Sequence, residues 1–262
     1  MNRAEFALLV ERHHAECFEA EARVPGVELH RDRDVIWVVH DGESWRNAGI
    51  MVRFQPRSAA HRLKTLVSRY QRHGRGIGLW ISPASTPSNL PDLLADRRLR
   101  CKKYFPAMVR ELNAANARTT LPPGLEINRV LDATVYETIP HPAIGAITTL
   151  LRRRALQRLA ALLSDPQHRT RSFVASLNGE LVGAIETFVG QTGAGIHGLN
   201  VLERFRGRGI GSALVEYACD DAARRQAKTM ALLATTEGQR VYSRRGFVEV
   251  ARFGYWYRSF QR

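Results

Sequence analysis

The chain has 262 residues, of which 44% are hydrophobic and 24% charged, a balance typical of a globular protein with one large domain or two small ones. Polar residues interrupt every apolar run well before the roughly 20 residues that a membrane helix requires, so we expect no membrane partner. The apolar stretch at the start contains Glu5 and Glu11, which is not the pattern of a secretory signal, and we expect a cytoplasmic protein.

The net charge of +14 is large enough to raise the question of a nucleic-acid partner. The charge is spread evenly, because residues 1–120 contain 20 basic and 13 acidic residues and the remainder 19 and 12, which leaves +7 in each part. The densest basic cluster is Arg152, Arg153 and Arg154 on a predicted helix, and there is neither a basic tail nor a zinc-finger spacing. We interpret most of the charge as a solvated arginine-rich surface, so a nucleic-acid partner is not favoured.

The three cysteines, Cys17, Cys101 and Cys219, form no C-x-x-C pair and have no neighbouring histidines at zinc spacing. We therefore expect reduced thiols and no metal site. Cys219 lies among apolar helix positions, which favours a buried packing role over a reactive one.

The first half of the sequence switches between helical and strand-like spacing. A helix is predicted where Leu63, Leu66, Val67 and Tyr70 repeat at i, i+3, i+4 and i+7, with Gly74 closing it. After an opening helix, the predicted order is strand, strand, helix, strand, helix, strand. The other predicted elements of this half cover residues 3–20, 27–40, 48–54, 77–82, 90–99 and 101–112.

A polar segment that ends in Pro122, Pro123 and Gly124 separates the two halves, because these residues exclude regular structure. We therefore predict a first domain at residues 1–115, a linker at 116–123 and a second domain at 124–262.

The second half repeats the rhythm of the first. Asn178-Gly179 between two strand-like runs is a strong hairpin signal, and a helical region at 132–164 is interrupted at Pro140 and Pro142. The other predicted strands cover residues 124–130, 171–177, 180–189, 195–201, 230–235 and 248–258, with helices after residue 209 and at 237–245.

A glycine-rich loop, R-x-x-G-x-G, contains Arg206, Gly209 and Gly211 and stands between a predicted strand and an amphipathic helix. Glycines there let consecutive N–H groups converge, and the helix start adds unpaired N–H groups and the positive end of its dipole. This context predicts a pyrophosphate cradle, although a bare strand-to-helix turn can carry the same letters. The similar glycines at residues 73–78 end a helix and precede a strand, so we interpret them as a helix cap and turn.

These residues resemble the GNAT acetyltransferase superfamily. Residues 199–219 look like its motif A and residues 230–248 like its motif B, which ends in Tyr242, Gly246 and Phe247. The resemblance covers residues 120–262 and implies an α/β fold with a mixed α+β sheet, splayed between the strands near 196–202 and 229–235. It also implies acetyl-CoA as a co-substrate, with pantetheine in the gap. The implied coenzyme-binding residues are Leu199, Val201, Arg206, Gly207, Arg208, Gly209, Ile210, Gly211, Ser212, Thr235 and Tyr242.

The first half resembles a degenerate copy of the same fold, as in the tandem GNAT proteins of actinobacteria. At the position of its phosphate loop stands RFQPRSAAHRL, which has Pro56 and no glycine. Since a backbone cradle cannot form there in the same way, we expect no coenzyme and a structural role for this half. The chain is thus predicted to hold two tandem GNAT-like domains, of which the C-terminal one carries the acetyl-CoA-binding motif.

The resemblance implies direct attack of an amine on the thioester within a ternary complex. The Val201 N–H is the implied oxyanion donor, and Tyr242 is the implied acid for the leaving thiolate, with packing against the coenzyme as its alternative role. Glu186 and His197, on adjacent strands, are both candidates for the base. The alternative roles are a hydrogen-bonded core histidine for His197 and a solvated strand residue for Glu186. Thr235 is either a pantetheine contact or an ordinary threonine at a strand end.

The acceptor is expected between the helical region at 132–164 and the last strand. Tyr255, Trp256 and Tyr257 on that strand fit core packing better than a substrate cage. The sequence does not name the acceptor: a small-molecule primary amine is the first hypothesis, a protein or peptide amine the second, and a coenzyme- or nucleic-acid-binding module without turnover the third. The acetyl group is inferred from the habit of the family, and a homodimer is left open.

Overall fold

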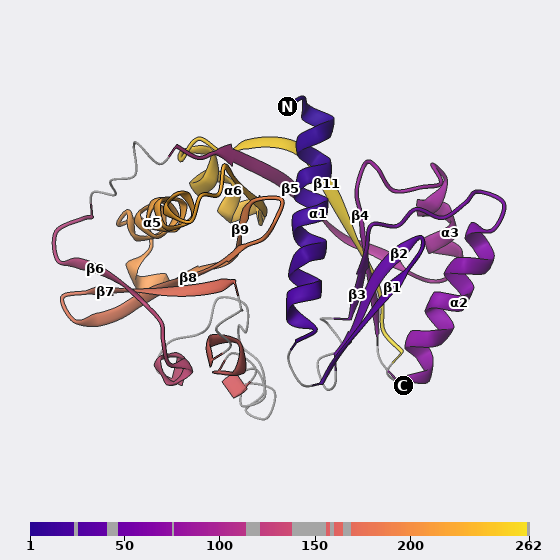
Figure 1. Cartoon of the computed structure of the whole chain (residues 1–262), viewed down its shortest axis with the longest axis horizontal. Coiled ribbons are helices and arrows are strands. Elements are labelled where there is room, and N and C mark those ends of the chain that lie inside the picture. The colour runs from indigo at the N-terminus through magenta and orange to yellow at the C-terminus, as the bar shows by residue number, and fades with distance from the viewer. Residues whose placement is uncertain are drawn as a thin grey trace. The chain divides into compact units, whose positions relative to one another are not determined.

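The computed structural model describes residues 1–23, 26–40, 47–74, 76–113, 121–137, 156–157, 160–164 and 169–260. Two compact units make up the chain, the first formed by Met1–Ala107 with Glu249–Arg262 and the second by Met108–Val248. Helices and a mixed sheet build each unit (Figure 1). None of the helices within these described ranges is long and apolar enough to cross a membrane.

In the first unit, strands β1 to β3 are antiparallel neighbours, and β3 pairs in parallel with β4 after the crossover helix α2. The strand order is β1-β2-β3-β4-β11-β5. The elements are α1 (Arg3–Glu21), β1 (Val27–Asp32), β2 (Val35–His40), β3 (Ala48–Ile50), α2 (Ala59–Arg72), β4 (Ile77–Ile81), α3 (Leu90–Asp96), β5 (Arg100–Glu111) and β11 (Val248–Arg258).

Two strand predictions in this unit were wrong in detail. Residues 27–40 form a hairpin rather than one strand, with Asp32 opposite Val35 at its end. The strand predicted at 48–54 ends at Ile50, because Met51 adopts a left-handed backbone with φ of 58° that a strand cannot continue through.

The core of the first unit lies between α2 and the sheet. Leu63, Leu66 and Tyr70 are buried on one face of α2, as their spacing predicted, and pack with Trp37 of β2 and Leu79 of β4. The Tyr70 hydroxyl donates to the Val38 carbonyl at 2.9 Å, which satisfies the one polar group of this buried ring.

In the second unit, β6 to β9 are antiparallel neighbours, and β9 pairs in parallel with β10 after the crossover helix α5. The order continues from the end of β5 as β10-β9-β8-β7-β6. The elements are β6 (Leu125–Arg129), η3 (Ala133–Glu137), β7 (Thr170–Leu177), β8 (Glu180–Val189), β9 (Ala194–Val201), η4 (Glu203–Phe205), α5 (Ile210–Arg224), β10 (Thr229–Leu233) and α6 (Thr236–Ser243).

The predicted hairpin turn is confirmed, since Asn178 and Gly179 join β7 to β8 with φ values of 52° and 84°. Positive φ at both residues defines the turn type that matches the twist of a hairpin. The break predicted at Pro140 and Pro142 and the arginine cluster at 152–154 lie outside the described residues.

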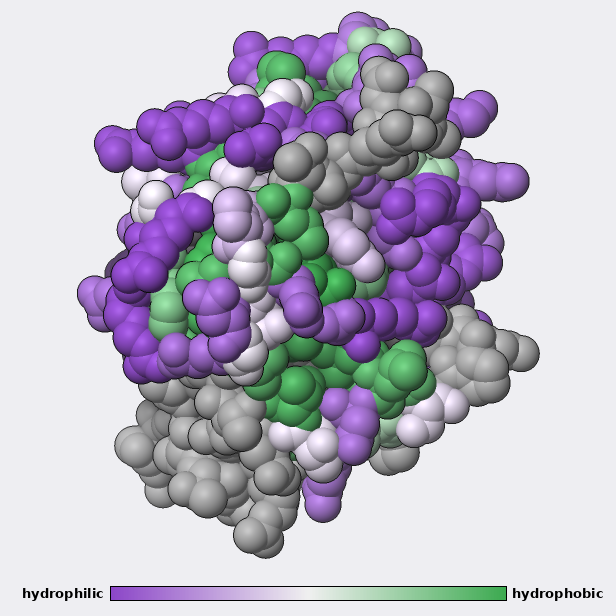
Figure 2. Space-filling model, turned by 90° about the vertical axis from the view of Figure 1, so that its left-hand side faces the viewer, coloured by the Kyte–Doolittle hydropathy of each residue, from purple (hydrophilic) through white to green (hydrophobic). Residues whose placement is uncertain are grey.

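Helix α5 covers one face of the second sheet and buries Ile210, Ala213 and Leu214 against it. A smaller apolar cluster, which contains Val174 and Ala184, lies apart from this core. Figure 2 faces the elements labelled on the left of Figure 1 and shows apolar side chains at the surface framed by strongly hydrophilic ones.

The structure corrects the C-terminal boundary of each predicted domain. Glu249–Arg262 belong to the first unit, where β11 pairs with β4, and Met108–Glu111 at the end of β5 belong to the second. The aromatic rings explain why β11 belongs to the first unit. Tyr255 lies over Gly78 of β4 and Tyr257 over Gly76 just before that strand, and a Cβ at either glycine would lie 2.3 Å from the tyrosine hydroxyl. These rings are packing residues of the first unit, as their spacing favoured.

Candidate active site

The parallel pair β9 and β10 separates early, which opens the second sheet. Only Met230 opposite Ala194 and Ala231 opposite Gly195 are paired in the described residues. Beyond them β9 runs on to Val201 along β8 alone. The splay implied by the GNAT resemblance is therefore present between these two strands.

The register of β8 and β9 shows which groups of β9 face this gap. Leu202 donates its N–H to the Val182 carbonyl at 2.9 Å, so this pair is hydrogen-bonded. Because antiparallel pairs alternate between bonded and non-bonded, Val201 opposite Gly183 and Leu199 opposite Ile185 are non-bonded pairs. Their N–H and C=O groups thus point away from β8 toward the gap, where the resemblance places pantetheine and the oxyanion.

The loop after β9 delivers a helix start beside that edge. Gly207 and Gly209 have φ values of 78° and 80°, a left-handed conformation that only glycine adopts without cost. Within the described residues, no acceptor takes the N–H groups of Ile210, Gly211 or Ser212 at the start of α5. A positive helix end with three unpaired donors fits a pyrophosphate.

Gly211 brings the helix start next to the gap. A Cβ there would lie 3.6 Å from Cγ2 of Val201 and 3.9 Å from Cδ2 of Leu199, which are ordinary contacts. The protein's own packing therefore has room for a Cβ at this position, and the glycine leaves the backbone there accessible to a ligand. The residues present thus fit a coenzyme whose pyrophosphate meets α5 and whose chain follows β9.

Three arginines line the loop, and each has a partner within the chain. Arg204 pairs with Glu180, and the guanidinium groups of Arg204 and Arg208 lie 5.1 and 5.2 Å from the Phe205 ring centroid. Arg206 turns back, and its Nε donates to the Val201 carbonyl at 3.1 Å. Sequence reasoning missed Phe205, a buried ring at which two of these arginines stack; the arginines before and after it, Arg204 and Arg208, were the available signal.

Tyr242 lies on α6, the helix that follows β10 on the other side of the gap. Its ring is buried, with Phe247 edge-on at 5.6 Å, and it lies over Gly238 of the same helix, where a Cβ would come within 3.1 Å of the ring. Burial raises the pKa of Tyr242 well above its usual value near 10, and the neighbouring Cys219 raises the same pKa further. The phenol is therefore protonated at neutral pH, as an acid must be.

The two candidate bases lie on neighbouring strands. Glu186 pairs with Gly198, and the register shifts directly after it, which leaves His197 as the extra residue of a bulge in β9. Burial lowers the pKa of His197 below its usual 6.5, and the negative charge of Glu186 opposes that change. His197 is therefore largely neutral at pH 7 and able to accept a proton.

Thr235 does not stand on the strand as predicted, because β10 ends at Leu233. It caps α6 instead, with its hydroxyl accepting from the Gly238 N–H at 3.1 Å. The exposed hydroxyl retains its own hydrogen, so a pantetheine contact stays a prediction.

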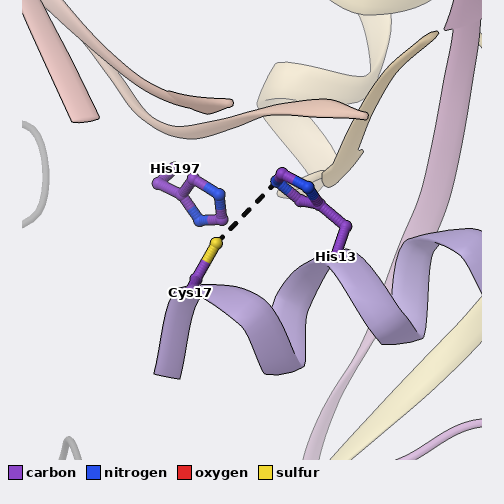
Figure 3. Close-up of side chains that lie close together, drawn as sticks. All are labelled: His13, Cys17 and His197. Atoms are coloured by element: carbon purple, nitrogen blue, oxygen red, sulfur yellow. Dashed lines mark hydrogen bonds between the residues drawn. The ribbon is translucent and has the colours of Figure 1, made fainter. Parts of the chain in front are cut away.

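All three cysteines are free thiols. Cys219 is buried on α5, where burial raises the pKa of its thiol to about 12, which fits the predicted packing role. Cys17 lies one turn after His13 on α1, with 3.8 Å between its Sγ and the histidine Nε2 (Figure 3).

Comparison with known proteins agrees with this geometry. Residues 141–247 match the Acetyltransferase (GNAT) family model, so this part of the chain is a GNAT domain. No curated protein matches the sequence. Family members use acetyl-CoA as co-substrate, and the residues around the gap fit that coenzyme.

Solved structures extend the likeness to the whole chain. A GCN5-related N-acetyltransferase from Kribbella flavida superposes with a TM-score of 0.70 at 17% identity, over 92% of this chain and 94% of that one. One from Sphaerobacter thermophilus gives 0.62 at 18% identity, over 100% and 95%. A tandem GNAT protein from the clavulanic acid biosynthesis pathway gives 0.60 at 13% identity, over 100% and 95%. At these identities the likeness shows the fold, which is that of two GNAT-like units in tandem.

Proposed function

We propose that the chain is an N-acetyltransferase that moves an acetyl group from acetyl-CoA to a primary amine of a small molecule, by direct attack within a ternary complex. The observation that carries the proposal is the open gap beside β9, whose exposed backbone edge adjoins three unpaired N–H groups at the start of α5. A closed sheet would lack the exposed edge of β9, and a capped helix would lack the unpaired N–H groups.

Binding is assigned to the backbone of the loop and of β9. The N–H groups of Ile210, Gly211 and Ser212 hold pyrophosphate, helped by the loop residues Gly207, Arg208 and Gly209. The gap-facing groups of Leu199 and Val201 bond the extended pantetheine chain, much as a further strand would. The coenzyme supplies the thioester carbonyl, and the Val201 N–H is placed to donate to the oxygen on which charge develops.

Two protons must move during the reaction. A lysine-like amine with a pKa near 10.4 is neutral in only about one molecule in 10³ at pH 7, a cost of roughly 4 to 5 kcal/mol. The base we favour is His197, because burial keeps it neutral and the negative charge of Glu186 stabilises its protonated form. Glu186 is the alternative base. Tyr242 gives its proton to the departing thiolate, because its raised pKa keeps it protonated until a strong base forms beside it.

The test is thiol release from acetyl-CoA by the purified full chain across a panel of small amines, amino-acid derivatives and peptides. Release with a small amine supports the proposal, whereas release only with peptides would assign the protein-amine alternative. Arg206→Glu is the control, because a carboxylate at the loop repels pyrophosphate. Tight coenzyme binding with no thiol release from any acceptor would favour a module without turnover and overturn the enzyme.

A further inference from the structure

The side chain of Arg206 is turned toward the strand that precedes it. Its Nε donates to the Val201 carbonyl at 3.1 Å, and its backbone N–H donates to the Glu203 carbonyl at 3.1 Å. The backbone bond thus closes the chain from Glu203 to Arg206, and the side-chain bond closes it from Val201 to Arg206. Leu202 anchors the same turn to β8 through the Val182 carbonyl.

The Val201 carbonyl stands where it would disfavour the charge that develops in the reaction. Since Val201 and Gly183 form a non-bonded pair, the Val201 carbonyl and N–H both point toward the gap. The N–H is the donor that a developing oxyanion needs, but an uncapped carbonyl on the same edge would repel that oxyanion. A donor that occupies the carbonyl removes this repulsion and holds the two flanking peptides in place.

We propose that Arg206 is a positioning residue that caps the Val201 carbonyl through Nε–H, and that this donor, rather than the positive charge of the guanidinium, is what the acyltransfer site requires. The inference rests on the proposed function and assigns to the first residue of the phosphate loop a task at the thioester end of the site. Pyrophosphate is left to the backbone N–H groups at the start of α5.

Two substitutions separate the donor from the charge. In Arg206→Gln, the amide nitrogen Nε2 stands the same number of bonds from Cα as the arginine Nε, so the cap can form without the charge. In Arg206→Lys the charge is kept, but a methylene replaces the donor at that position. If Arg206 binds phosphate, lysine should replace it better than glutamine, because lysine keeps the positive charge. If Arg206 caps the carbonyl, glutamine should replace it better than lysine, because glutamine keeps the N–H donor.

The experiment compares the kcat of these variants with two acyl donors, acetyl-CoA and S-acetyl-pantetheine, which lacks pyrophosphate. We expect Arg206→Lys to lose about tenfold with both donors, the size of one lost hydrogen bond to a charged donor, and Arg206→Gln to keep most of the rate. Arg204→Gln, which removes a neighbouring charge that pairs with Glu180, is the matched control and leaves both rates unchanged. A loss confined to acetyl-CoA, or a better rate for lysine than for glutamine, would overturn the proposal.

A second measurement, which does not depend on activity, tests the cap even if the proposed function is wrong. If the wild-type chain released no thiol with any amine, the cap would still be measured by amide hydrogen exchange of residues 201–206. The cap predicts faster exchange in Arg206→Lys than in the wild type and in Arg206→Gln. Equal exchange in all three would contradict the cap, whatever the activity.

Discussion

The two units build the same arrangement and differ at one place. In each, a run of antiparallel strands, β1 to β3 in the first unit and β6 to β9 in the second, leads through a crossover helix to a parallel strand, and the parallel pair has two paired residues. In the first unit those are Ala48 opposite Gly78 and Gly49 opposite Leu79. The first unit then closes again, because Arg53 pairs with Thr86 and Thr86 donates to the Val52 carbonyl at 3.1 Å. The second unit stays open.

An ion pair with a buried carboxylate stabilises the closed end of the first unit. The Glu11 carboxylate from α1 accepts from the Ser82 hydroxyl at 2.7 Å, directly after β4, and pairs with Arg53. The next helix, α2, begins after Ser58 without a left-handed glycine, and the loop before it contains Pro56. The comparison shows what a coenzyme needs from this fold: strands that stop pairing, and a glycine turn into the next helix.

The largest effect is expected from Glu11→Ala, which removes one partner of this pair. The loss of the hydrogen bonds that Glu11 accepts from Arg53 and Ser82 should lower the free energy of unfolding of the first unit by roughly 3 kcal/mol. Chemical denaturation followed by tryptophan fluorescence measures the change. Glu19→Ala on the same helix is the control, because its ion pair with Arg31 is at the surface and is worth less than about 1 kcal/mol. Equal losses in the two variants would contradict the role of Glu11.

The comparison also predicts how many coenzymes the chain holds and where. Gly209 and Gly74 both have left-handed φ, of 80° and 63°, but only Gly209 leads into a helix start. Gly209→Val should therefore weaken coenzyme A binding by about 100-fold or more, because at least two N–H groups at the start of α5 would no longer point at the pyrophosphate. Gly74→Val carries a similar backbone penalty and should leave affinity unchanged. Calorimetry measures both, with one site per chain expected; a second site would mean that the first unit is not closed to coenzyme.

Tyr242→Phe tests the acid without disturbing the cradle. The substitution keeps the buried ring and removes the proton, so we expect kcat to fall by about 100-fold while coenzyme affinity is retained. Because the pKa of Tyr242 is raised, the wild-type rate should show no loss from tyrosine ionisation up to about pH 10. A kcat near that of the wild type would leave Tyr242 as a packing residue.

The sequence predicted the parts of this comparison that depend on neighbouring residues. Gly209 and the strand before it are local, and so is Pro56, which marked the first unit as lacking a cradle. The exchange of β11 into the first unit could not be predicted, because strand partners are chosen by distant contacts such as those of Tyr255 over Gly78. The capping role of Thr235 was missed because the end of β10 is set by where pairing with β9 stops.

The smallest expected effect distinguishes the two candidate bases. Protonated His197 cannot accept a proton, so kcat/KM should fall as the pH drops through the pKa of His197, which burial places below 6.5. Glu186 stabilises the imidazolium, and removing its charge in Glu186→Gln lowers that pKa further. The acid limb of the profile should therefore move to lower pH. If Glu186 were the base itself, Glu186→Gln would lose activity at every pH; if the two groups were uncoupled, the limb would stay in place. His197→Gln separates these readings further, because the acid limb disappears only when His197 is the group that titrates.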